Sequence, residues 1–377
     1  MNLSYWEKKS FLGQQDLIII GSGIVGLSAA IHYKAESPQS NVMVIDGGII
    51  PQGASTKNAG FACIGSAGEL LSDLEKNSED EVFGLLERRK KGLELLRKTL
   101  GNEQICYEHF GGYEIFSDAA KYLKIAQHIE KFNKKLNIIT GKAKTFTLVD
   151  DQIKTFGFKG VKHLIKNNCE GQLDTGKMMR ALMSKAQSVG VYLLASAKIE
   201  SIINNELKTG VVLIDGQKIE SKKVLICTNG FAKELLPEID VRPARAQVLV
   251  TSPIENLKIK GSFHFDEGFY YFRNIDGRVL LGGGRNLDFE VETTTVFENT
   301  NLIMDRLKAM LSEMIIPGEK YTIEAEWSGI MAFGENKNPI VKQVEPNIYC
   351  AVRLGGMGVA IGSLVGKEAV ELMLENV

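Results

Sequence analysis

The stretch Asp16-Leu17-Ile18-Ile19-Ile20-Gly21-Ser22-Gly23-Ile24-Val25-Gly26 decides the fold that we expect for this chain. It opens with a short apolar run, which is typical of a strand buried on both faces. Three glycines with the spacing GxGxxG follow, and Ala29 and Ala30 suit a helix that packs tightly against a sheet. A second buried strand is expected at Val42 to Ile45, directly before Asp46.

A strand, a glycine turn, a helix, a second strand and an acidic residue together form the unit that binds dinucleotides. In such a unit Gly21 makes the tight turn, Gly23 lets the backbone approach a pyrophosphate, and Gly26 lets the helix meet the strand. The helix N-terminus supplies N–H donors and a positive dipole. Asp46, which lies 20 residues after Gly26, would accept hydrogen bonds from a ribose. The motif alone does not distinguish NAD from FAD.

The composition is that of a globular protein. The 377 residues include 38 Gly but only 8 Pro, a balance that suggests backbone lying close to another group. Because 45 Lys and Arg nearly cancel 46 Asp and Glu, the chain lacks the basic charge of a nucleic-acid binder. Its length exceeds what one core usually serves, so we expect two domains.

No stretch approaches the roughly 20 apolar residues that span a bilayer. The segment Met1 to Gln15 lacks the apolar core of a signal peptide, so we expect a cytoplasmic protein with no integral membrane segment. The five cysteines are scattered without a CxxC pair, and the five histidines are dispersed. This pattern argues against a disulfide framework and against a metal site.

The segment that follows Asp46 favours FAD over NAD. A simple NAD dehydrogenase would continue with regular alternation of strand and helix. Here Gly47 to Gly68 is a long loop of mostly small residues. Such a loop is too long for a mere connection, and we interpret it as wrapping a ligand.

At this loop the chain resembles the D-amino acid oxidase superfamily of FAD-dependent oxidoreductases, which includes glycine oxidase and sarcosine oxidase. The resemblance covers nearly the whole chain, and its landmarks occur in the order found in the family. They are Gly21 to Gly26 with Asp46, Ser55 to Gly60, Leu173-Asp174, Thr228-Asn229-Gly230, Arg242 to Gln247, Leu280 to Gly283, Trp327-Ser328-Gly329 with Pro339, and Gly355 to Gly358.

The resemblance implies an α/β fold with two domains. One is a Rossmann-like FAD-binding domain, discontinuous in sequence, that comprises residues 1–85, 168–240 and 330–377. The other is an α+β substrate domain built on a mixed, largely antiparallel sheet, and it comprises residues 86–167 and 241–329.

The resemblance also implies which residues lie around FAD. A helix that starts at Gly358 would aim its positive end at the negative charge of a reduced flavin. The implied set is Gly21, Ser22, Gly23, Ile24, Val25 and Gly26 at the pyrophosphate; Asp46 and Gly47 at the ribose; Ile199 at the adenine; Ser55, Thr56, Asn58, Ala59, Gly60 and Phe61 on the flavin side; Thr228, Asn229 and Gly230 after a buried strand; and Gly355, Gly356, Met357, Gly358 and Val359 under the flavin.

Three positions depart from the family pattern. Amino acid oxidases of the family typically carry an Arg shortly after Trp-x-Gly, where this chain has Met331. Sarcosine-oxidase relatives attach flavin through a Cys in this region, but here there is only Ser328, so non-covalent FAD is expected. Those relatives also place a Lys over the flavin where Leu280 stands, so fast reaction with oxygen is not implied.

The family places a strand that faces the substrate at Gly268 to Arg273. Side chains alternate along a strand, so Tyr271 and Arg273 share one face. These two are the leading candidates for contact with substrate, and Arg285 and His264 are the next.

The implied reaction is oxidation of an amino acid or amine. The substrate loses a hydride to flavin N5, and the resulting imine hydrolyses. An alternative is an FAD-dependent 2-hydroxyacid dehydrogenase that passes electrons to a carrier other than oxygen, for which His264 would be the candidate general base. A flavin-binding protein without turnover and a simple NAD dehydrogenase are disfavoured. Oxygen or another acceptor completes the cycle, and the sequence names neither the acceptor nor the substrate.

Overall fold

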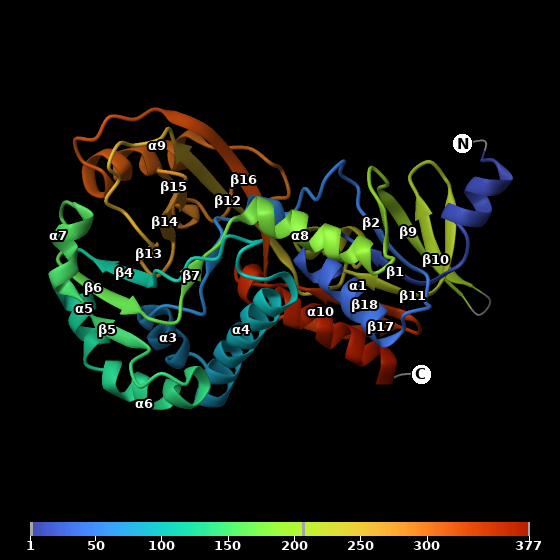
Figure 1. Cartoon of the computed structure of the whole chain (residues 1–377), viewed down its shortest axis with the longest axis horizontal. Helices are drawn as coiled ribbons and strands as arrows, with labels where there is room; N and C mark the ends of the chain where they lie inside the picture. Colours follow the sequence, from blue (N-terminus) through green and yellow to red (C-terminus); the bar gives the residue numbers. More distant parts are fainter. Residues whose placement is uncertain (1–2, 206–207, 376–377) are drawn as a thin grey trace.

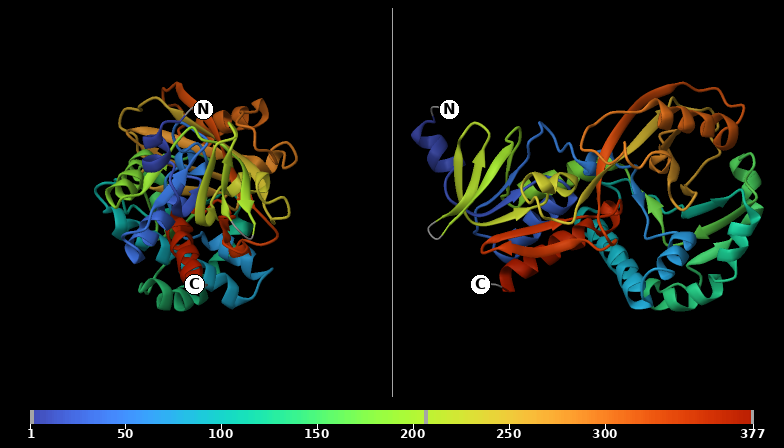
Figure 2. Two further views of the ribbon diagram at one scale, coloured as in Figure 1. Left: turned by 90° about the vertical axis from the view of Figure 1, so that its right-hand side faces the viewer. Right: turned by 180° about the vertical axis from the view of Figure 1, so that it is seen from behind.

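The computed structural model describes residues 3–205 and 208–375, and it arranges two large sheets in two lobes that lie side by side (Figure 1). The short helical segment η1 (Glu7–Phe11) and the end of α10 (Gly358–Glu375) both lie in the first lobe, as the second view of Figure 2 shows. The described part of the chain therefore starts and finishes in the first lobe and crosses to the second lobe in between.

The first sheet is mostly parallel, as the apolar runs predict. Its central strand is β1 (Gln15–Ile20), which lies between β2 (Val42–Ile45) and β11 (Lys218–Ile226). Ile18 of β1 pairs with Met43 of β2 on one side and with Val224 of β11 on the other, in parallel register. In spatial order the sheet contains β17 (Ile340–Glu345), β18 (Ile348–Val352), β11 (Lys218–Ile226), β1 (Gln15–Ile20), β2 (Val42–Ile45) and β8 (Tyr192–Leu194), and β10 (Thr209–Leu213) and β9 (Ile199–Asn204) extend from β11.

Helices cover one face of this sheet. The apolar sides of α1 (Ile24–Glu36), α8 (Thr175–Ser188), α10 and the start and end of α4 (Glu79–Leu100) share one core with Leu17 and Ile19 of β1. The opposite face packs against β9, β10 and the short turn η3 (Asn229–Glu234). The hairpin between β10 and β11 turns at Asp215 and Gly216, with Gly216 at φ +81°.

The second sheet is mixed and largely antiparallel, which confirms the expected fold class. Only one pair, β13 with β4, is parallel among the pairs of this sheet in the described chain. Its order is β16 (Ile323–Phe333), β12 (Arg242–Thr251), β15 (Arg278–Gly283), β14 (Tyr270–Ile275), β13 (Ser262–Phe265), β4 (Gly112–Phe116), β6 (His163–Asn167) and β5 (Phe146–Leu148).

One face of the second sheet is an aromatic and aliphatic core. Phe263 and Phe272, opposite each other on β13 and β14, stack with ring centres 4.8 Å apart. Helices α9 (Asn301–Met310) and α7 (Ile153–Phe156) and the segment η5 (Leu311–Ile315) cover this face. Because side chains alternate, the other face carries Tyr271 and His264, and it is turned toward the first lobe.

Three helices share a core at the far end of the second lobe: α3 (Ala67–Leu74), α5 (Ala119–Ala126) and α6 (Ile129–Thr140). The short helix α2 (Ala54–Lys57) instead packs against α8 and β16, near the start of α1. A capping box starts α4, because the Ser78 hydroxyl accepts from the Glu81 N–H and the Glu81 carboxylate accepts from the Ser78 N–H. The loop of residues 47–68 is called the ligand loop below. Its strand β3 (Phe61–Ala62) pairs with β7 (Gly171–Gln172), which lies between β6 and α8 in the chain.

Two apolar stretches are divided in the structure. The residues from Ile105 to Phe116 do not form one strand, since the chain turns at Cys106, which has φ +47°, and β4 begins only at Gly112. The residues from Asp118 to Leu136 form two helices, α5 and α6, with a turn at Gln127 and His128 between them.

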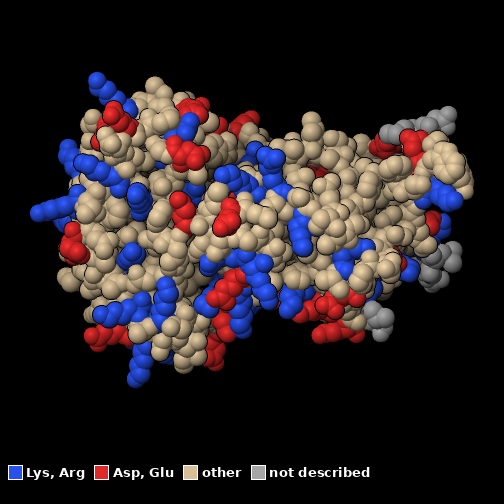
Figure 3. Space-filling view, in the orientation of Figure 1, with Lys and Arg blue, Asp and Glu red and all other residues tan. Residues whose placement is uncertain are grey.

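Charged side chains are distributed over both lobes. On the face shown in Figure 3, Lys and Arg are interspersed with Asp and Glu, in keeping with the near-zero net charge. Within the described residues, no helix has both the length and the apolar character needed to cross a membrane.

Candidate active site

The turn that follows β1, from Gly21 to Gly26, has no room for side chains at two of its three glycines. Gly21 has φ +105°, a conformation that L-residues with side chains rarely adopt. A Cβ atom on Gly26 would lie only 2.0 Å from the carbonyl oxygen of Gly21. The first and third glycines of the motif are therefore required by the tight contact between β1 and α1.

The carboxylate of Asp46 lies at the end of β2, beside the glycine turn. One of its oxygens, Oδ2, accepts from the N–H and the hydroxyl of Ser22 at 2.9 and 2.6 Å, and Oδ1 accepts from the Gly48 N–H at 2.9 Å. The backbone oxygen of Asp46 accepts from the Ala197 N–H, which brings the strand of Ile199 alongside. The residues expected at the ribose and the adenine thus lie together.

The Ser55 to Phe61 segment folds back onto the start of α1. The Ser55 hydroxyl oxygen accepts from the Ile24 N–H at 3.0 Å, in the first turn of that helix. The Thr56 hydroxyl donates to the Pro51 carbonyl, and Asn58 accepts from the Gly60 N–H and from the Thr175 hydroxyl. These bonds hold the loop, Ala59 included, against the glycine turn.

Thr228 carries an unpaired polar atom next to the glycine turn. It lies two residues after the end of β11, and the Cβ position of Gly21 is 3.5 Å from its backbone nitrogen. Its hydroxyl oxygen is buried and has no hydrogen-bond partner among the residues that the structure describes. Since buried polar atoms are nearly always paired, this hydroxyl fits a site that is completed by a ligand.

The residues after Thr228 bring the C-terminal glycines to the same edge of the sheet. Asn229 accepts from the Arg353 N–H at 3.1 Å, and a Cβ on Gly230 would lie 2.8 Å from the Met331 carbonyl. Gly355 and Gly356 both have positive φ, and α10 begins at Gly358, just before the buried Val359.

Two glycines let α10 lie directly on α1. A Cβ on Gly362 would be 2.8 Å from the Ile24 side chain, and one on Gly366 would be 2.7 Å from the Val25 carbonyl. Helices α1 and α10 are therefore side by side, and both begin at the same edge of the first sheet. Two positive helix ends thus face one region, which suits a cofactor with a pyrophosphate and an electron-accepting ring.

Tyr271 and His264 form a wall beside the ligand loop. They are directly opposite each other on β14 and β13, and the Phe61 ring contacts both edge-on, with centres 5.6 and 5.3 Å away. The Tyr271 ring lies over Gly282, where a Cβ would be 2.7 Å from it. Burial raises the pKa of Tyr271 to about 12, so its phenol is neutral at ordinary pH.

Arg273 shares the face of Tyr271, but its Nε and Nη1 donate to backbone carbonyls. Its Nη1 donates to the Gly60 carbonyl at 2.9 Å and to the Leu173 carbonyl at 2.6 Å. The residue is buried, and burial lowers its pKa to about 10, which keeps it charged at neutral pH. The guanidinium therefore fastens the ligand loop to the second sheet.

Arg285 follows the turn at Gly283 and Gly284. Its guanidinium carbon is 4.8 Å from the Phe289 ring centre and 4.6 Å from that of Phe333. Phe333 and Met331 lie on one face of β16, because the register with β12 is regular there. Of the expected substrate residues, Tyr271 and His264 are thus adjacent, while Arg285 lies on a separate wall.

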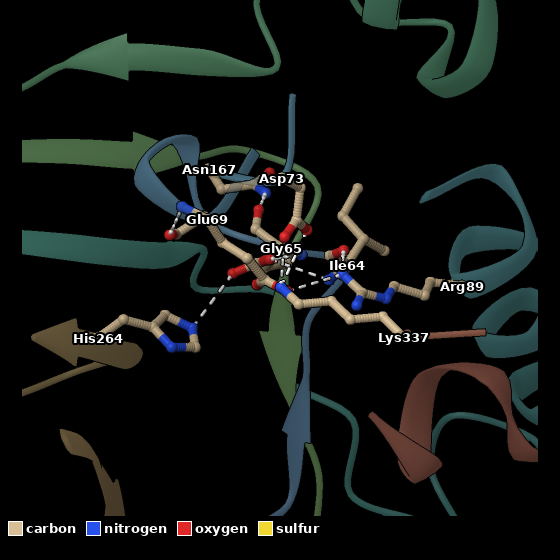
Figure 4. A network of polar contacts seen from close by, with 10 residues as sticks. Ile64, Gly65, Glu69, Asp73, Arg89, Asn167, His264 and Lys337 are labelled. Carbon is tan, nitrogen blue, oxygen red and sulfur yellow. Dashed lines mark hydrogen bonds and ion pairs between the residues drawn. The ribbon is translucent and has the colours of Figure 1, made fainter. Parts of the chain in front are cut away.

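A buried polar network, shown in Figure 4, holds the end of the ligand loop, and the sequence patterns did not reveal it. Glu170 Oε1 accepts from the N–H groups of Ile64 and Gly65, both at 2.9 Å. Its other oxygen, Oε2, faces His264 Nε2 at 3.7 Å, and neither of these buried atoms has a hydrogen bond within the described chain. Burial opposes the charged imidazole, but Cys63 and Glu170 outweigh it and raise the pKa of His264 well above its usual value.

The same network contains two carboxyl groups with opposite shifts. Burial by itself raises the pKa of Glu69, but the charges of Arg89 and Lys337 lower it to about 2. Glu114 accepts from the Gly68 N–H at 2.9 Å, and burial raises its pKa to about 7. Nothing local in the sequence marks these residues, since the network joins α3, α4, β4, β6 and the loop at Lys337.

Substitution of Glu114 by glutamine is expected to change how stability depends on pH. Because the pKa of Glu114 is higher in the folded protein, the protonated carboxyl group favours folding. This contribution is fully present below the ordinary pKa of 4.5, and it is lost as pH rises through 7. As pH rises from 4 to 8, the unfolding free energy of Glu114→Gln should therefore increase by about 3 kcal/mol relative to that of the unmodified protein. Urea unfolding at several pH values measures this gain. Substitution of the exposed residue Glu130 by glutamine is the control. The prediction would be contradicted if the unmodified protein, Glu114→Gln and Glu130→Gln showed the same dependence of unfolding free energy on pH.

Comparison with known proteins agrees with this geometry. The family model described as FAD dependent oxidoreductase matches residues 16–372. The chain is 22% identical to "Probable oxidoreductase OrdL" of Haemophilus influenzae, over 95% of this chain and 83% of that protein.

Two solved structures show the same fold. L-proline dehydrogenase from P. horikoshii superposes with a TM-score of 0.78 at 18% identity, over 96% of this chain and 94% of that one. Glycine oxidase from Bacillus cereus superposes with a TM-score of 0.77 at 18% identity, over 96% and 97%. The site and the fold together define a flavin-dependent oxidoreductase. This chain belongs to the D-amino acid oxidase family of FAD-dependent oxidoreductases.

Proposed function

We propose that this protein oxidises the carbon–nitrogen bond of an amino acid or amine. The observation that carries the proposal is the wall of Tyr271 and His264, which Phe61 joins to the ligand loop. A substrate that packs against this wall would be shielded from water on that side. The solved structures of similar fold named above, a glycine oxidase and an L-proline dehydrogenase, support a substrate of this kind.

The proposed division of labour follows the two lobes. Residues 1–85, 168–240 and 330–377 would hold FAD, and 86–167 and 241–329 would hold the substrate; residues 1–2, 206–207, 376 and 377 lie outside the described ranges. The glycine turn would hold the pyrophosphate, the Asp46 region the ribose, and the Thr228 hydroxyl a polar atom of the cofactor. Non-covalent binding is supported by Ser328, which offers no thiol for a flavin link.

The chain's own residues would mainly orient substrate and exclude water. When bound, FAD supplies the acceptor for the hydride that leaves the carbon next to the substrate's nitrogen. Tyr271 stays neutral, and its hydroxyl donates or accepts one hydrogen bond to orient the amine. The imine product then hydrolyses in water. Oxygen or another carrier would take the electrons afterwards.

A 2-hydroxyacid dehydrogenase is the second candidate, and the pair of His264 and Glu170 is the observation in its favour. Oxidation of an alcohol requires a base to take the hydroxyl proton. The raised pKa of His264, however, favours an imidazolium, which has no lone pair to accept that proton. This electrostatic setting supports the amine reaction over the hydroxyacid reaction.

The test is anaerobic reduction of the purified protein. We expect a yellow protein whose visible absorbance is bleached by at least one amino acid or amine, and acid precipitation should release the flavin into the supernatant. Bleaching by a 2-hydroxyacid and by no nitrogen compound would establish the second candidate instead. A colourless protein that FAD cannot reconstitute would contradict both. Admission of air then separates an oxidase from a dehydrogenase.

A further inference from the structure

Arg285 has an unusual position for a charged side chain. Gly283 has φ +122° and Gly284 has φ +80°, so the chain turns before Arg285, and a Cβ on Gly283 would lie 2.0 Å from the Phe269 carbonyl oxygen. The turn takes Arg285 out of the strand register of β15 and into the short helical turn η4 (Arg285–Leu287). The backbone of Arg285 therefore leaves the sheet at a turn that depends on two glycines.

The guanidinium has aromatic neighbours but no hydrogen-bond acceptor. It contacts the rings of Phe289 and Phe333, and within residues 3–205 and 208–375 it forms neither a hydrogen bond nor an ion pair. Burial lowers its pKa, yet an arginine keeps its charge at neutral pH. The nearby acid Glu292 is already engaged, because it accepts from Arg245 and from Gln247.

A half-buried cation without a partner is costly, and cation–π contacts offset only part of that cost. The aromatic contacts restrict the plane of the guanidinium while its N–H edges remain free. Such an arrangement suits a planar anion that can accept two parallel hydrogen bonds, as a carboxylate does.

The free guanidinium lies near the glycines that open α10. Phe333, which it contacts, is 4.0 Å from the Cβ position of Gly356, and Met331 Sδ is 3.4 Å from that position. Met331 and Phe333 point to the same side of β16 as Trp327, whose Nε1 donates to the Lys57 carbonyl of the ligand loop. The charge of Arg285 thus stands at the edge of the proposed cofactor and substrate site.

We propose that Arg285 binds the carboxylate of the substrate, and that the substrate class is therefore an amino acid and not an amine without a carboxyl group. This inference rests on the proposed function for the reaction itself. It assigns to η4 a recognition role that the strand pattern of β14 had suggested for Arg273, whose Nε and Nη1 donate to backbone carbonyls. Arg285 is a specificity residue, because it fixes one end of the substrate and leaves the reacting carbon to FAD.

The experiment compares the holoprotein with Arg285→Met, Arg285→Lys and a control, Arg278→Met. Arg278 lies on the same strand, β15, and its guanidinium binds Glu324 at the surface. Propanoate is titrated as the probe, and binding is followed by calorimetry and by the visible spectrum of the flavin. We expect Arg285→Met to weaken propanoate binding roughly 10- to 100-fold, Arg285→Lys to weaken it less, and Arg278→Met to leave it unchanged.

A kinetic comparison completes the test. For the best amino acid and its decarboxylated amine, Arg285→Met should raise the KM of the amino acid and leave that of the amine unchanged. Equal propanoate affinity in Arg285→Met and the unmodified protein, or an equal loss in Arg278→Met, would overturn the inference. If propanoate binding depends on Arg285 but no nitrogen compound bleaches the flavin, the carboxylate site stands and the proposed reaction fails. If plain amines bleach as well as amino acids, the reaction stands and the carboxylate site fails.

Discussion

Substitution of Gly26 by valine is expected to yield a protein that retains little or no flavin and is less stable by about 3 kcal/mol or more. The Cβ of any other residue would lie 2.0 Å from the Gly21 carbonyl oxygen, so α1 must move away from β1. That movement would also separate α1 from Gly366 of α10, whose Cβ position is only 2.7 Å from the Val25 carbonyl. Both helix ends that face the cofactor would shift together.

The measurements are the flavin content of the purified variant and its unfolding by urea. Gly84→Ala is the matched control, because nothing lies within 4 Å of a Cβ at that position in α4. Alanine there should stabilise the protein by roughly 0.5–1 kcal/mol, since it reduces the entropy of the unfolded chain. Normal flavin content in Gly26→Val would refute the packing argument.

Substitution of Arg245 by methionine is expected to cost about 3–5 kcal/mol of unfolding free energy. The Arg245 guanidinium donates through Nε and Nη2 to the two oxygens of Glu292, both at 2.8 Å, and the two residues are only 3% and 1% exposed. Methionine would leave the Glu292 carboxylate buried without its charge partner. Gln247, which donates to the same carboxylate at 2.9 Å, cannot replace the lost charge.

The surface pair of Arg278 and Glu324 is a close control, since Nε and Nη2 of Arg278 also donate to the two carboxylate oxygens of Glu324. Arg278→Met should cost no more than about 1 kcal/mol, because solvent screens that pair. The double variant Arg245→Met with Glu292→Leu should recover much of the loss, because it removes the unpaired charge. Urea unfolding of the four proteins gives these differences, and equal costs for the two single variants would disprove the role of burial.

The Arg245 and Glu292 pair also bears on the site. Glu292 lies in the segment between η4 and α9, and Gln247 accepts from the Thr300 N–H at the end of that segment. The pair therefore holds to β12 the segment that carries Phe289, on which the Arg285 guanidinium rests. Loss of the pair should weaken propanoate binding as well as stability.

Local sequence predicted the first lobe well. The apolar run at Leu17 to Ile20 and the GxGxxG spacing describe contacts between residues that are close in sequence, so a strand, a turn and a helix could be inferred from them. The second lobe was harder to predict. Strand β13 is only four residues long, and its pairing with β4 joins segments about 150 residues apart, which no local pattern reveals.

The sequence by itself determined the glycine turn, the acidic end of β2 and the family, because each of these depends on residue types at fixed spacing. The tertiary structure decided which cations are free. Arg273 and Arg285 look equivalent in sequence, yet Arg273 donates to the Gly60 and Leu173 carbonyls, while Arg285 rests on two aromatic rings. Whether a charge has a partner depends on segments distant in the chain, so only the folded arrangement shows which guanidinium is available to a substrate.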